Sequence, residues 1–195
     1  MARWFSIKPT LTMRGRKFKG IRGFAGKPFH PPLTDIPVAA YFLGGIFNLL
    51  SFLFHGSNAE ASHNLFLAAA YTFVIGYIVA IPTILTGFWD WWKSTEKHTQ
   101  AWRTANWHMA VMLTTQLLVL FTLLAIFANW DQGFADFKIM ILSVIDATMV
   151  SFGALYGGAL VYEYGFNVET SGDHPVWHKS EEDVFPGQET HPADS

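Results

Sequence analysis

The residues best suited to chemistry inside this chain are one isolated acid and a few histidines. Asp146 lies in the middle of a long apolar run. An acid facing lipid would be costly, so we expect its side chain to face other helices. No Lys or Arg lies at a comparable depth, so we expect a neutral carboxyl group, hydrogen-bonded to Gln116 or Asn48. It could serve as a proton-relay group or as a polar contact between helices.

Two histidines, His30 and His108, lie near the beginnings of apolar runs. Neutral imidazoles on bundle helices are common axial ligands of b-type haem. These two residues are therefore our candidate cofactor ligands, and haem b is the candidate cofactor. His55 and His63 flank the loop after the first run and form a second pair. No histidine lies at the middle of a run, as a haem relay across a membrane would usually require.

Further polar residues are expected at the same end of the molecule as His30 and His108. The first and third apolar runs begin there, while the second and fourth runs end there. This predicted polar cluster contains Asp35, Asp90, Arg103, Asn106, Tyr162 and Tyr164. Because Pro37 follows Asp35 closely, we expect Asp35 to cap the first helix.

The elements that must position these residues are four apolar runs, at about 36–54, 65–89, 107–127 and 137–162. The chain is 51% hydrophobic and only 14% charged, against roughly 25% charged residues in soluble domains. A helix needs about 20 apolar residues to cross a bilayer. Nothing else in the chain could cover four such helices in water. We therefore predict an all-α integral membrane protein whose transmembrane domain spans 35–166.

The connections and the basic residues predict how these helices are arranged. Short connections favour an up-down-up-down bundle of four transmembrane helices. All but one of the 13 Lys and Arg residues fall in the leader 1–34, the middle loop 90–106 and the tail 167–195. Only Lys138 falls on the opposite side. The positive-inside rule then predicts that both termini are cytoplasmic and that the chain resides in the cell membrane.

The two ends of the chain differ in charge. The leader 1–34 is basic, and the tail 167–195 is acidic and proline-containing, so we expect the tail to be disordered.

Gly153 and Gly157 should give the fourth helix a flat face that another helix can approach.

Several functional classes lack support in the sequence. There is no cysteine, hence no disulfide, thiolate metal site or cysteine nucleophile. No hydrolase, zinc-protease or phosphate-loop motif occurs, so we lean against an enzyme and predict no metal site. Membrane topology accounts for the basic leader, so we do not expect nucleic-acid binding. The expected partners are the lipid bilayer and other subunits of a membrane complex.

Four segments resemble a known family of bacterial membrane proteins. They are FHPPLTDIPVAA at 29–40, TGFWDWW at 86–92, RTANWH at 103–108 and GGALVYEYGFNV at 157–168. These segments are similar to the family labelled "domain of unknown function 2231", over about residues 26–168. The resemblance implies a four-helix membrane protein and transfers no activity.

Three functions remain open. The first is a non-catalytic membrane subunit or scaffold that acts through partners. We favour it because it is the least specific of the three functions. The second is a haem b-binding or quinone-linked electron-transfer subunit using His30 and His108. The third is a small proton-linked transporter using Asp146. Four spans without an internal repeat argue against a transporter protomer.

Overall fold

The computed structural model describes residues 20–21 and 28–166 and shows four long helices and no β-strand within those residues. The predicted acidic tail and most of the predicted leader lie outside the described residues. The helices are α1 (His30–Phe54), α2 (Ala59–Ser94), α3 (Gln100–Ala128) and α4 (Phe137–Tyr162), with a short 3-10 helix η2 (Trp130–Gln132) before α4.

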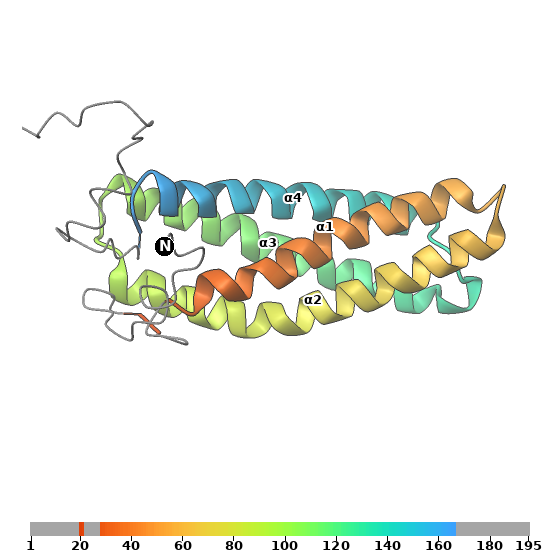
Figure 1. Cartoon of the computed structure of the whole chain (residues 1–195), viewed down its shortest axis with the longest axis horizontal. Helices are drawn as coiled ribbons and strands as arrows, with labels where there is room; N and C mark the ends of the chain where they lie inside the picture. Colours follow the sequence, from red (N-terminus) through yellow and green to blue (C-terminus); the bar gives the residue numbers. More distant parts are fainter. Residues whose placement is uncertain (1–19, 22–27, 167–195) are drawn as a thin grey trace, which may run out of the picture.

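The four helices lie side by side and form a bundle (Figure 1). The chain reverses direction at each of the connections 55–58, 95–99 and 129–136, as Figure 1 shows. α1 packs most extensively on α2 and also contacts α4, while α3 packs on α4. The beginnings of α1 and α3 therefore lie at the same end of the bundle as the ends of α2 and α4. We call this the histidine end, because His30 and His108 lie there.

Three of the four helices begin at a side chain that accepts a hydrogen bond from the first turn. Asn58 accepts from the Ala61 amide at 3.0 Å, and Thr99 accepts from the Trp102 amide at 3.1 Å. Asp136 accepts from the amide of the third residue of α4 at 2.8 Å. These caps satisfy amides that have no partner within the helix, so they fix where α2, α3 and α4 start.

The expectation that Asp35 caps the first helix is wrong. α1 begins at His30, and its N-cap residue Phe29 makes no side-chain hydrogen bond. Pro31 and Pro32 occupy the first turn, where a missing amide proton costs little and a fixed φ angle suits the helix. Asp35 consequently lies within the helix and is exposed.

Close contacts between helices occur where glycines leave room. An added Cβ at Gly44 would lie 2.7 Å from the Phe73 ring, and one at Gly76 would lie 2.7 Å from the Ala40 Cβ. Both contacts join α1 and α2. On the other side of α1, a Cβ at Gly45 would lie 2.7 Å from the Ser143 carbonyl oxygen of α4. Small residues thus allow α1 to approach two neighbours closely.

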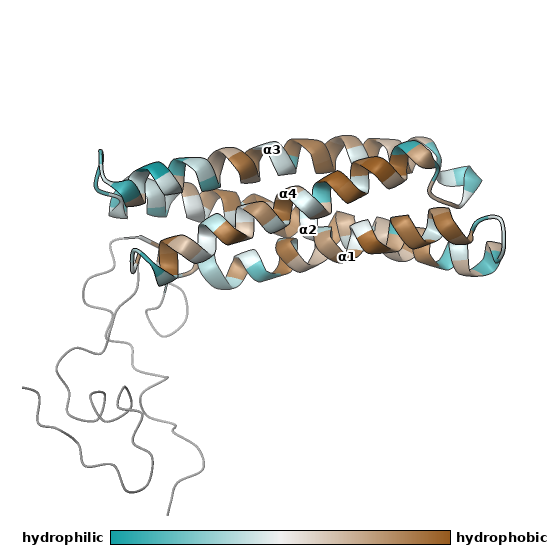
Figure 2. Cartoon of the chain, turned by 90° about the horizontal axis from the view of Figure 1, so that it is seen from above, coloured by the Kyte–Doolittle hydropathy of each residue, from teal (hydrophilic) through white to brown (hydrophobic). Residues whose placement is uncertain are grey.

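Hydrophobic residues predominate along the middle of the helices, and hydrophilic residues gather at both ends of the bundle (Figure 2). Large apolar side chains point outward there, including Leu85, which is 66% exposed. All four helices are long and apolar enough to span a membrane. A bundle that exposes such side chains matches lipid rather than water as its surroundings, as expected from the sequence.

Candidate functional site

His30, the first residue of α1, is held against α2. Its Nδ1 lies 2.9 Å from the carbonyl oxygen of Thr83. The imidazole also lies close to the α2 backbone at Gly87, because an added Cβ there would lie 2.5 Å from the ring Cε1. The ring is partly buried. One hydrogen bond and one glycine therefore fix the orientation of this side chain.

His108, in α3, is held against α4 in the same way. Its Nδ1 lies 2.8 Å from the carbonyl oxygen of Gly153. An added Cβ at Gly157 would lie 3.1 Å from the ring Cε1. In both cases the accepting residue and the glycine are four positions apart, which is about one helical turn. The helix pairs α1–α2 and α3–α4 thus each present one imidazole, supported by a carbonyl and a glycine of the second helix.

The two imidazoles meet at the histidine end. Their ring centroids are 6.5 Å apart and their planes are nearly perpendicular, at 82°. A backbone carbonyl can only accept a hydrogen bond, so Nδ1 of each ring must carry the proton and donate it. In the neutral side chain Nε2 then keeps a free lone pair. This is the tautomer that histidine adopts when it binds a metal through Nε2.

Thr83 supports this arrangement from α2. Its hydroxyl donates to the Val79 carbonyl oxygen at 2.8 Å and lies 3.4 Å from the Leu33 carbonyl oxygen of α1. The Leu33 carbonyl is available because Pro37, four residues later, has no amide proton to donate to it. Thr83 therefore contacts α1 through its hydroxyl and His30 through its carbonyl.

The predicted polar cluster divides into packed and exposed members. Asp90 is only 2% exposed, and its Oδ1 accepts a hydrogen bond from the Ile21 amide at 3.2 Å. Asn106 accepts a hydrogen bond from the Trp91 indole at 2.8 Å, which joins α3 to α2. The remaining members are exposed: Asp35, Arg103, Tyr162 and Tyr164. The structure thus brings Asp90 and Asn106 into the packed histidine end and leaves those four at its surface.

The second histidine pair supports a loop at the opposite end of the bundle. His63 bonds through Nδ1 to the Gly133 carbonyl oxygen at 2.9 Å. The His55 ring stacks on Phe134 with centroids 3.5 Å apart. Both partners belong to the connection 129–136, so these histidines have a structural role as loop contacts.

Asp146 faces the bundle interior and is 0% exposed, but its hydrogen-bond partner differs from the expected ones. The Thr122 hydroxyl donates to its Oδ2 at 2.6 Å. Gln116 accepts instead from the Tyr41 hydroxyl at 2.7 Å, and Asn48 donates to the Ser143 hydroxyl at 2.8 Å. The donor that the structure shows for Asp146 is therefore Thr122 and not Gln116, because the rotation of each helix decides which polar side chain reaches the acid. The expected bond between Asp146 and Asn48 stays a prediction.

Comparison with known proteins decides the family. The model of the family described as "Predicted membrane protein (DUF2231)" matches residues 26–170. The match includes all four helices and both histidines of the site. The chain belongs to this family. The resemblance found in the sequence is therefore confirmed, and the DUF2231 description names a membrane protein without an activity. No curated protein and no solved structure gave a significant match.

Sequence reasoning missed several residues of this DUF2231 protein that contact His30, His108 or Asp146. Gly87 and Thr122 were not singled out, and Gly153 and Gly157 were expected to form a flat face for another helix. That face receives His108 and Met112 of α3. The available signal was a pair of residues four positions apart on the second run (83 and 87) and on the fourth run (153 and 157). This spacing does not reveal that an imidazole of another helix packs there.

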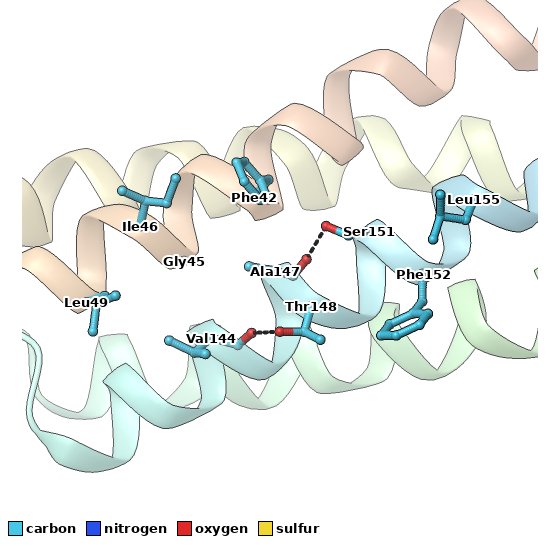
Figure 3. A pocket seen from close by; sticks show the side chains of 10 residues that line it. All are labelled: Phe42, Gly45, Ile46, Leu49, Val144, Ala147, Thr148, Ser151, Phe152 and Leu155. Carbon is cyan, nitrogen blue, oxygen red and sulfur yellow. Dashed lines mark hydrogen bonds between the residues drawn. The ribbon is translucent and has the colours of Figure 1, made fainter. Parts of the chain in front are cut away.

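A groove of about 430 Å³ lies between α1 and α4, away from the histidines (Figure 3). Its lining is mostly apolar, from side chains such as Phe42, Leu49 and Leu155. The two hydroxyls in it, of Thr148 and Ser151, donate to carbonyls of their own helix. The groove of this DUF2231 chain thus suits an apolar occupant such as a lipid chain and has no polar group directed at a ligand.

Proposed function

We propose that the chain is a membrane electron-transfer subunit that binds a b-type haem between His30 and His108. The observation that supports this function is the pair of matching imidazoles, each with Nδ1 bonded to a helix carbonyl, which leaves the Nε2 atom of the neutral ring unprotonated. Because the rings come from the two different helix pairs, a cofactor bound by both would join the halves of the bundle.

The separation of the two rings would allow both imidazoles to hold one metal ion. With metal–nitrogen distances of about 2.0 Å, two imidazoles on opposite sides of a metal have ring centres roughly 6 Å apart. The observed centroid separation is 6.5 Å.

The donor set favours haem over a bare metal ion. In the part of the chain that the structure describes, no group of three or more His, Cys, Asp or Glu side chains could hold a metal. A structural zinc ion uses four protein ligands, and a catalytic one uses three. Haem brings its own equatorial nitrogens and needs only axial ligands from the protein. Two histidines are then sufficient.

The residues of the chain have defined tasks in this proposal. When bound, haem would supply reversible one-electron chemistry, and His30 and His108 would hold it. The carbonyls of Thr83 and Gly153 fix the tautomer and orientation of the two rings, and such bonds also raise ligand basicity. The site lies toward one end of the bundle, where a quinone or a neighbouring subunit of a complex can approach.

The orientation that we propose is an up-down-up-down transmembrane bundle in a bacterial inner membrane, with both termini in the cytoplasm. Among the described residues, Lys93, Lys97 and Arg103 lie at the histidine end and Lys138 lies at the other. The positive-inside rule then puts the histidine end at the cytoplasmic face.

The direct test is an absorption spectrum of the protein purified in detergent after expression with haem supply, oxidised and then reduced with dithionite. We expect a Soret band and sharpened bands on reduction in the wild type. His30→Ala and His108→Ala should each lose most of the bound haem, whereas His63→Ala, at the loop contact, should retain it. A colourless wild-type protein would contradict the proposal and favour the non-catalytic subunit or scaffold.

A further inference from the structure

Two oxygen atoms in the middle of the bundle are buried without a hydrogen-bond partner. They are Oδ1 of Asp146 and Oδ1 of Asn48, and both residues are 0% exposed. A buried acceptor that has lost water without gaining a donor is costly, and such groups are rare in folded proteins. We therefore expect a hydrogen-bond donor for these two oxygen atoms between α1 and α4.

The contacts around these oxygens place Asn48 of α1 beside the face of α4 that carries Asp146. Asn48 donates through Nδ2 to the Ser143 hydroxyl at 2.8 Å, and Ser143 lies three residues before Asp146 on α4. Residues three apart lie on the same helix face. The other carboxyl oxygen of Asp146 already accepts from Thr122 at 2.6 Å. At this contact, the two Oδ1 atoms are therefore the buried acceptors for which the described residues show no donor.

No basic side chain in the described part of the chain can supply it. Lys138, the nearest one along α4, is exposed and precedes Asp146 by eight residues, or about 12 Å of helix. The titratable side chains of α1 and α2 close to this region are Tyr41 and Tyr77. The Tyr41 hydroxyl is directed to Gln116 of α3. None of these groups brings a positive charge to the acid.

We propose that Asp146 and Asn48 form a proton-binding site, in which a single proton on Asp146 Oδ1 is directed at Asn48 Oδ1. A proton satisfies both atoms with one bond. A metal cation would need several oxygen ligands, whereas the two hydroxyls nearby already donate to Asp146 or accept from Asn48. The site places one titratable proton in the dry interior of the bundle, in addition to the cofactor site at the histidine end.

Infrared spectroscopy of the reconstituted full-length protein tests the site directly. At neutral pH the wild type should show a protonated carboxyl C=O band that disappears in Asp146→Asn. Thr122→Val should shift this band upward, because the C=O group loses its hydrogen bond from Thr122. Glu60→Gln, at an exposed position, should leave the band unchanged. If the wild type shows no such band, or Asp146→Asn keeps it, the proposal is wrong.

Thermal unfolding distinguishes a bound proton from a bound metal cation. An asparagine at position 146 can donate to Asn48 and accept from Thr122 as a protonated acid does, so Asp146→Asn should melt within about 3 °C of the wild type. Asp146→Leu cannot, and should melt roughly 5 °C lower or more. A wild-type melting temperature that rises with sodium concentration and no longer does so in Asp146→Asn would overturn the proton assignment.

Discussion

At the scale of single residues, the site depends on glycines as much as on histidines. Each imidazole lies against a helix backbone at a glycine, where an added Cβ would come within 2.5 Å of His30 or 3.1 Å of His108. The hydrogen bond from Nδ1 to the carbonyl one turn earlier requires this close approach. The two glycines therefore determine how the histidines can be oriented, although neither has a side chain that could bind anything.

Gly87→Ala should weaken haem binding. The new methyl group would lie 2.5 Å from Cε1 and 2.8 Å from Nδ1 of His30, so the ring would have to move away from the Thr83 carbonyl. We expect a lower haem-to-protein ratio and an altered Soret band in the purified variant.

The matched control for this change is Gly158→Ala in α4. There the nearest atom, in the Tyr162 ring, is 3.9 Å away, which is an ordinary contact. This variant should keep the wild-type spectrum. Gly157→Ala should fall between the two, since its methyl group would lie 3.1 Å from His108. Equal spectra for all three variants would argue against glycine as the positioning element.

At the scale of helices, α1 and α2 form the closest pair. Gly44 of α1 meets the Phe73 ring of α2, and Gly76 of α2 meets Ala40 and Tyr41 of α1. His30 lies at the beginning of α1, so the angle at which these two helices pack also determines where its imidazole meets Thr83. Helix packing and site geometry are therefore connected through the same glycine contacts.

Gly76→Ala should destabilise the bundle by about 1–3 kcal/mol, the usual cost of overpacking a filled interior. The added Cβ would lie 2.7 Å from the Ala40 Cβ and 2.8 Å from the Tyr41 ring. Denaturant or thermal unfolding in detergent measures the loss. Adding Ala40→Gly should recover part of the stability, because it removes one of the two close contacts.

Gly56→Ala is the control for the packing prediction. A Cβ at Gly56 has no other atom within 4 Å, so this variant should unfold like the wild type. If Gly76→Ala were as stable as Gly56→Ala, the close approach of α1 and α2 would not be a constraint on stability.

At the scale of the whole molecule, the proposed orientation decides on which side of the membrane the histidine end lies. The chain contains no cysteine, so single cysteines can report the location of each loop. Ser57→Cys in the connection 55–58 should react with a membrane-impermeant maleimide added to intact bacteria. Lys97→Cys in the connection 95–99 should react only after the membrane is permeabilised. The reverse pattern would place the histidine end outside the cytoplasm.

The sequence by itself determined the number and character of the helices. Apolar content is a sum over local residues, so it can be read from the sequence. Four apolar runs of sufficient length in a chain with few charges predict helices whose outer surface contacts lipid. The convergence of His30 and His108 at one end could also be expected, because it needs only short connections between antiparallel helices. The beginning of α1 was missed, since hydropathy marks apolar residues, whereas the helix also includes His30 and the prolines that follow it.

Only the tertiary structure decided which side chains meet. Each residue turns a helix by about 100°, so the partner of a buried group depends on the rotation and shift of neighbouring helices. For this reason the hydroxyl that donates to Asp146 comes from Thr122, whereas Gln116 bonds to Tyr41. The same reason explains the histidines: hydropathy cannot show that a carbonyl of α2 or α4, and a glycine one turn later, lie where an imidazole reaches them.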